Sequence, residues 1–140
     1  MIQRVQTLFL LGVILCAVAA LFLPLLDFVD PKGSLGAFST QMEDGTSSAN
    51  YQVAAVIILI AVVAGISIFK YANRLTQIKL GTLISALTAG AIALTVFTQD
   101  YPFKITFGGW ALLAGLVFNF FANWFIRKDE KLVRDSERLR

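Results

Sequence analysis

The chain has 140 residues, with 12 Lys and Arg, 9 Asp and Glu, and a formal net charge of +3. Hydrophobic residues make up 57% of it, charged residues only 15%, and the mean hydropathy is +0.74. A soluble domain carries about 25% charged residues, so this chain lacks the polar surface that a water-exposed globule needs. The basic residues are dispersed along the chain, which argues against a nucleic-acid-binding protein.

Four apolar stretches follow one another, at about residues 5–26, 51–69, 80–98 and 105–126. Each has about the 20 residues that cross a hydrocarbon core about 30 Å thick, and none contains Asp, Glu, Lys or Arg. Backbone groups in lipid must pair within their own segment, which requires helices, and no period-2 alternation suggests barrel strands. The sequence predicts an all-α integral membrane protein: one domain, residues 1–140, folded as an antiparallel bundle of four transmembrane helices.

The first stretch has some features of a signal peptide, because Arg4 precedes an apolar run that reaches the sequence AVAA. The apolar run continues beyond AVAA through LFLPLL. We therefore expect a retained helix.

The distribution of Lys and Arg predicts the orientation. Ten lie in the amino end, the connector between the second and third stretches, and the tail, whereas the other side has only Lys32 and Lys104. Since basic residues favour the cytoplasmic side, we expect both termini in the cytoplasm. Trp110 and Trp124 would then lie near the two membrane interfaces.

The loop at residues 27–50 would lie on the outer side. Asp30-Pro31-Lys32-Gly33 matches a type I turn, and Asp44-Gly45 is a second turn signal. The intervening SLGAFSTQM could form one strand, and YPFKITF between the last two stretches could form another. These segments predict a small outer β-structure over the bundle.

The third stretch has small residues at every fourth position: Gly81, Ser85, Ala89 and Ala93. Small residues at this spacing let helices approach closely in lipid. We favour packing within this bundle, and the alternative is contact with a second protein.

Asn119 and Asn123 are four residues apart and share one helix face. An Asn in lipid seeks a partner across a helix interface, so we favour a packing role. The alternative is a polar site in a small-solute or lipid transporter. No Asp, Glu, Lys, Arg or His lies within the four stretches, which disfavours ion-coupled transport.

The sequence contains no recognisable catalytic, cofactor-binding or metal-binding motif. There is no His, only one Cys, and no glycine pattern that binds nucleotides. We therefore expect no catalytic activity, no cofactor and no metal site.

Ten of the fourteen residues in the tail at residues 127–140 are charged, with six basic and four acidic side chains. Acid–base pairs at helical spacing, such as Glu130 with Arg134, favour a cytoplasmic helix that extends the fourth stretch. Three roles fit: a topology-fixing flank, an anionic-lipid binder or a protein-docking segment. The low net charge makes lipid attraction modest. The residues that would bind a partner are Leu132, Val133, Arg134, Arg138 and Leu139.

The opening MIQRVQTLFLL and the closing KDEKLVRDSERLR together resemble a family of small four-span membrane proteins of the Bacteroidota. That family is catalogued as domain of unknown function 4293, and the chain departs from its closing pattern at Asp135-Ser136. The resemblance implies a bacterial inner-membrane protein with four helices. It does not imply any particular activity.

These observations predict a non-catalytic accessory or scaffold subunit of the inner membrane. Besides the lipid bilayer, its partners would be a larger membrane protein or a second copy, and a cytoplasmic protein at the tail. The alternative is a small-solute or lipid transporter with a polar site near Asn119 and Asn123.

Overall fold

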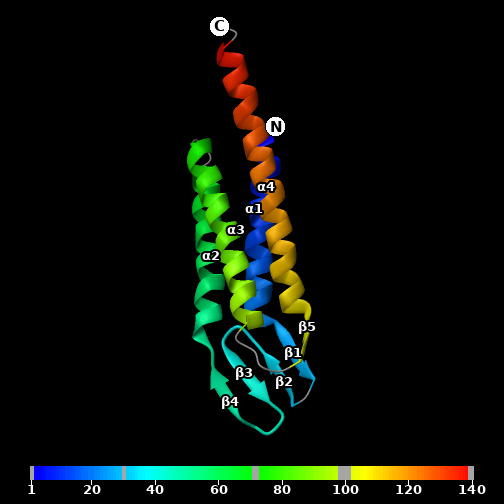
Figure 1. The fold of residues 1–140 in the computed structure, drawn as a ribbon. Helices are drawn as coiled ribbons and strands as arrows, with labels where there is room; N and C mark the ends of the chain where they lie inside the picture. The colour runs from blue at the N-terminus through cyan, green and yellow to red at the C-terminus, as the bar shows by residue number, and fades with distance from the viewer. Residues whose placement is uncertain (1, 30, 71–72, 98–101, 139–140) are drawn as a thin grey trace.

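The computed structural model describes residues 2–29, 31–70, 73–97 and 102–138. These residues form four long helices and a small sheet (Figure 1). The helices are α1 (Ile2–Phe22), α2 (Tyr51–Phe69), α3 (Arg74–Phe97) and α4 (Phe107–Arg138). Consecutive helices run in opposite directions and pack as a ring, in which α4 closes against α1.

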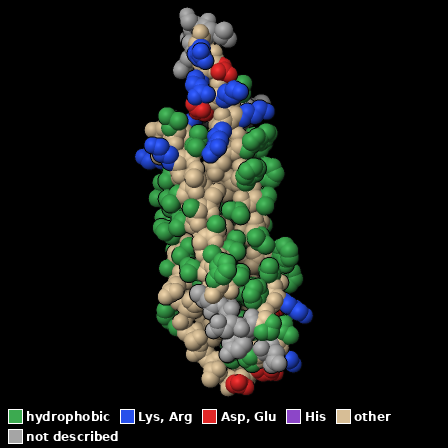
Figure 2. All heavy atoms as spheres, in the orientation of Figure 1, with side chains coloured by type: hydrophobic (Ala, Val, Ile, Leu, Met, Phe, Trp, Pro, Cys, Tyr) green, Lys and Arg blue, Asp and Glu red, His purple; other side chains and the backbone are tan. Residues whose placement is uncertain are grey.

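All four helices are long and apolar enough to cross a membrane. Figure 2 shows hydrophobic side chains along the flank of the bundle, with Lys and Arg gathered toward one end and acidic side chains at both ends. The start of α1 and the end of α4 lie at the same end of the molecule, and the sheet lies at the other (Figure 1). The predicted four-helix bundle is therefore present.

The predicted outer β-structure is an antiparallel sheet of five strands, ordered β4-β3-β2-β1-β5. The strands are β1 (Leu26–Val29), β2 (Lys32–Leu35), β3 (Ser39–Met42), β4 (Ser47–Ala49) and β5 (Phe103–Ile105). The turn at Asp44-Gly45 is as expected, because Gly45 has φ 78°, which other residues rarely adopt. Since β5 pairs with β1, the two loops at this end of the bundle form a single layer.

The structure differs from one prediction about the long loop, and a second falls partly outside the described residues. SLGAFSTQM is not one strand, because the chain turns at Gly36, whose N–H donates to the Ser39 carbonyl at 2.9 Å. The predicted type I turn begins at Asp30, which lies outside the described residues. Its last position, Gly33, is already within β2 and pairs with Phe28, so the strand begins earlier than expected.

The helix bounds also differ from the predicted stretches. α1 ends at Phe22 rather than Leu26, because Pro24 has no N–H to continue the helix. α3 begins at Arg74 rather than Leu80, since the Asn73 side chain accepts a hydrogen bond from the Thr76 N–H at 3.3 Å. α4 begins at Phe107 rather than at residue 105, which belongs to β5.

Close contacts join the start of α4 to the chain between α1 and β1. The Gly108 N–H donates to the Pro24 carbonyl at 2.9 Å, and the Thr106 hydroxyl donates to the same oxygen. A Cβ on Gly108 would lie 2.5 Å from that oxygen, and one on Gly109 would lie 2.6 Å from the Leu25 carbonyl. Only glycine allows this approach, which fixes the sheet to the bundle.

Aromatic rings fill the contact between α1 and α4. The Phe9 ring stacks against Phe121 and Phe125, with ring centroids 5.7 and 5.6 Å apart. The Phe118 ring lies over Gly12, where a Cβ would be 3.3 Å from it. Large rings on α4 thus pack against α1, which includes a small residue at this contact.

Candidate functional site

Helix α4 continues without interruption into the charged tail. It has 32 residues and extends beyond the ends of the other three helices (Figure 1). No Gly or Pro follows Gly115 in the chain, so nothing in the sequence breaks the helix. Arg134 lies 3.8 Å from Glu130 across one helical turn, which adds modest support. The expected C-terminal helix is therefore present.

The tail is anchored to the bundle at its base. Asp129 pairs with Arg74 at the start of α3, with 3.3 Å between a guanidinium nitrogen and a carboxylate oxygen. The Lys128 ammonium lies 5.4 Å from the centre of the Trp124 ring, within the range of a cation–π contact. These contacts end the packed part of α4, because the side chains at residues 131–136 are exposed.

The exposed end of α4, defined by residues 131–136 and Arg138, contains most of the predicted partner-binding residues. Leu132 and Val133 are exposed, although both are apolar. Arg134 and Arg138 are also exposed and lie one helical turn apart, so they share a face. Leu139 lies outside the described residues. This segment thus presents two apolar side chains beside interleaved basic and acidic ones, with no other element of the described chain packed against it.

Asn119 joins α4 to α3. Its side chain is fully buried, and its amide group donates to the Gly81 carbonyl at 2.8 Å and to the Ser85 hydroxyl at 2.7 Å. Asn123 packs beside it, where its carboxamide oxygen occupies the space that a Cβ on Gly81 would fill. We call these four residues the α3–α4 clasp. This arrangement joins the two helices, as the favoured packing role requires, and the alternative of a polar transport site stays a prediction.

The small residues of α3 do not all face the same neighbour. Gly81 is buried and Ser85 is half-buried, and both are in the clasp. Ala93 is half-buried, whereas Ala89 is exposed. The favoured interpretation, packing within this bundle, therefore holds for Gly81 and Ser85 and does not hold for Ala89. An α-helix has 3.6 residues per turn, so a spacing of four rotates steadily around the helix.

A buried polar layer near the tail end of the bundle was not predicted. The Gln77 amide on α3 donates to the Ser67 carbonyl on α2 at 2.9 Å. Gln6 on α1 is also buried, at 4% exposure. Each residue lies within two turns of a helix end, where exposed polar side chains are common. The sequence alone therefore did not distinguish these buried residues from exposed ones.

Within residues 2–29, 31–70, 73–97 and 102–138, no three His, Cys, Asp or Glu side chains lie close enough together to hold a metal ion.

The fold defines a class: a four-helix bundle with helices long enough to span a membrane, closed at one end by a five-stranded sheet. The chain belongs to the family described as Domain of unknown function (DUF4293), whose model matches residues 2–139. The family resemblance read from the two ends of the chain is therefore confirmed. No curated protein and no solved structure matches the chain.

Proposed function

We propose that this protein is a non-catalytic accessory subunit of the bacterial inner membrane that docks a cytoplasmic protein on the exposed end of α4. The observation that carries the proposal is the shape of this helix. It passes the ends of its neighbours as one continuous rod and exposes Leu132 and Val133 to solvent. Exposed apolar side chains beside interleaved charges suit a protein partner, because charge complementarity gives specificity.

Membrane insertion is part of the proposal. The apolar flank in Figure 2 lies between the basic end and the sheet, as a hydrocarbon layer requires. Trp110 near the sheet and Trp124 near the tail are both exposed, which suits interfacial anchors. With four crossings both termini lie on the same side of the membrane. Because most Lys and Arg residues are on that side, we expect the tail in the cytoplasm and the sheet outside.

The orientation can be tested with reporters. A reporter that is active only in the cytoplasm should work when it is fused after Arg140 and should be silent when it is inserted at Gly45, in the loop between β3 and β4. The reason is the excess of Lys and Arg at the tail end. Activity at Gly45 together with silence at Arg140 would show the opposite orientation.

Docking can be tested by charge reversal. Changing Arg134 and Arg138 to Glu should abolish recovery of a bound partner and leave membrane insertion unchanged, because both side chains are exposed and beyond the packed bundle. Each lost charge pair at such an interface costs about 2–5 kcal/mol. Recovery is measured by pull-down of the tagged full chain in mild detergent.

The matched control changes Lys32 and Lys104 to Glu. These two residues are exposed and lie in the sheet at the opposite end, so the change in net charge is the same. Equal loss of the partner in both variants would indicate a general charge effect, and the docking role would be wrong.

A further inference from the structure

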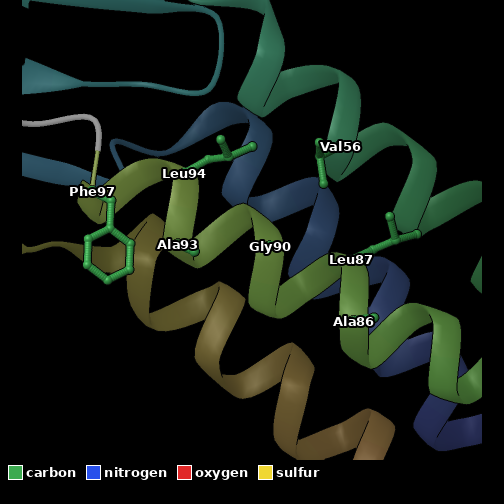
Figure 3. A pocket seen from close by; sticks show the side chains of 7 residues that line it. All are labelled: Val56, Ala86, Leu87, Gly90, Ala93, Leu94 and Phe97. Carbon is green, nitrogen blue, oxygen red and sulfur yellow. The ribbon is translucent and has the colours of Figure 1, made fainter.

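A groove runs along the outer surface of α2 and α3 toward the sheet. It has a volume of about 490 Å³, and apolar residues and a glycine line it (Figure 3). Val56 comes from α2, and the α3 residues are Ala86, Leu87, Gly90, Ala93, Leu94 and Phe97. A Cβ on Gly90 would meet nothing within 4 Å, so the groove is open at its middle.

The length of the groove fits one leaflet of a bilayer. From Ala86 to Phe97 the helix axis advances about 16 Å, which is roughly half of a hydrocarbon core about 30 Å thick. A membrane-spanning partner helix would follow a contact stripe through both leaflets. The groove therefore matches an extended acyl chain in the leaflet on the sheet side better than it matches a helix.

A pocket of about 310 Å³, lined by both polar and apolar side chains, adjoins the groove at its sheet end, and Leu94 lines both. Thr40 and Ser48 pair across β3 and β4 and line it from the same face of the sheet. Asn50 and Gln52 line it from the start of α2, and the Asn50 side chain makes no capping hydrogen bond there. Among the described residues that line the pocket, none is charged.

We propose that the groove and the pocket together bind an amphiphile with an uncharged head. One acyl chain occupies the groove, and a head with hydroxyl or amide groups forms hydrogen bonds with the polar side chains of the pocket. A charged head finds no partner of opposite sign among those side chains. This inference rests on the proposed membrane insertion. The site lies at the opposite end of the bundle from the exposed end of α4, so it does not depend on the docking function (Figure 1).

The test uses the full chain in phosphatidylcholine vesicles. The probe is palmitoyl glycerol with a photoreactive diazirine on its chain, and the comparison probe has the same chain with an anionic phosphoglycerol head. The uncharged probe should label α3 between Ala86 and Phe97, and more strongly than the anionic probe does. Peptide mass spectrometry locates the label.

Two glycines supply a matched pair of variants. Gly90→Leu fills the groove and should lower labelling about tenfold, as expected when roughly two methylene groups lose their burial. Gly65→Leu places the same side chain in open space on α2, outside the groove, and should leave labelling unchanged. Changing both Asn50 and Gln52 to Ala should remove the preference between heads while the chain still labels the groove.

Three results would overturn the proposal. Equal labelling by the two probes in the parent chain would show no recognition of the head. Labelling that survives Gly90→Leu would show ordinary lipid contact. Cross-linking of α3 to a second polypeptide, with no labelling by the uncharged probe, would show that a helix covers the groove.

Discussion

Replacing Gly81 with alanine is expected to lower the free energy of unfolding by about 1–3 kcal/mol. A Cβ at this position would lie 1.9 Å from the Asn123 carboxamide oxygen and 2.6 Å from its nitrogen. The Asn123 side chain must then rotate away or α3 must move from α4, which strains the hydrogen bond from Asn119 to the Gly81 carbonyl. Thermal unfolding of the purified chain in detergent measures the change.

Two further variants show whether the clasp is the cause. Asn123→Ala combined with Gly81→Ala should recover part of the lost stability, because the smaller side chain leaves room for the new Cβ. Gly65→Ala is the control, since a Cβ there meets nothing within 4 Å. It should be neutral or slightly stabilising, because alanine favours a helix by about 1 kcal/mol over glycine. If Gly81→Ala melts like Gly65→Ala, the clasp does not hold the two helices together.

Gly108→Ala is expected to have a larger effect, about 3 kcal/mol or more. Its Cβ would lie 2.5 Å from the Pro24 carbonyl oxygen and 2.7 Å from the Leu23 carbonyl oxygen. Both are backbone atoms, so no side chain can rotate to relieve the contact. The start of α4 must separate from Pro24, which breaks the hydrogen bond from the Gly108 N–H. Loss of stability is again measured by thermal unfolding.

Hydrogen exchange separates this effect from general destabilisation. β5 is joined to the bundle through the residues around Gly108, so the amides of β1 and β5 should exchange faster in Gly108→Ala than in Gly81→Ala. The central amides of α2 should be affected least. Unchanged exchange in both strands would show that the sheet does not depend on this junction.

The four helices could be predicted because apolar residues dominate four runs of membrane-spanning length. The helical tail followed from Glu130 and Arg134 at helical spacing, a pair that the structure contains. A small β-structure was predicted from turn chemistry, above all Asp44-Gly45, where a positive φ favours glycine, but its five strands and the pairing of β5 with β1 were not. A local rule was enough to predict that these elements exist, whereas the pairing of β5 with β1 is a tertiary contact.

Helix faces were harder to predict. In lipid the outer surface is as apolar as the core, so hydrophobicity does not indicate which side of a helix is buried. Ala89 is exposed although its spacing groups it with buried Gly81. The pair between Arg74 and Asp129 joins residues that are far apart in the sequence. Such contacts depend on how the helices are arranged in space, and a local sequence pattern does not specify that arrangement.

The most direct test of the proposed function compares the full chain with a chain truncated after Glu130, both purified in gentle detergent and measured as intact complexes by mass spectrometry. Truncation at this point keeps the Arg74–Asp129 pair and removes the exposed end of α4. Docking predicts that the full chain carries a partner in fixed stoichiometry and that the truncated chain, equally stable, has lost it. The same partners on both chains, or a full chain without any partner, would contradict the docking function.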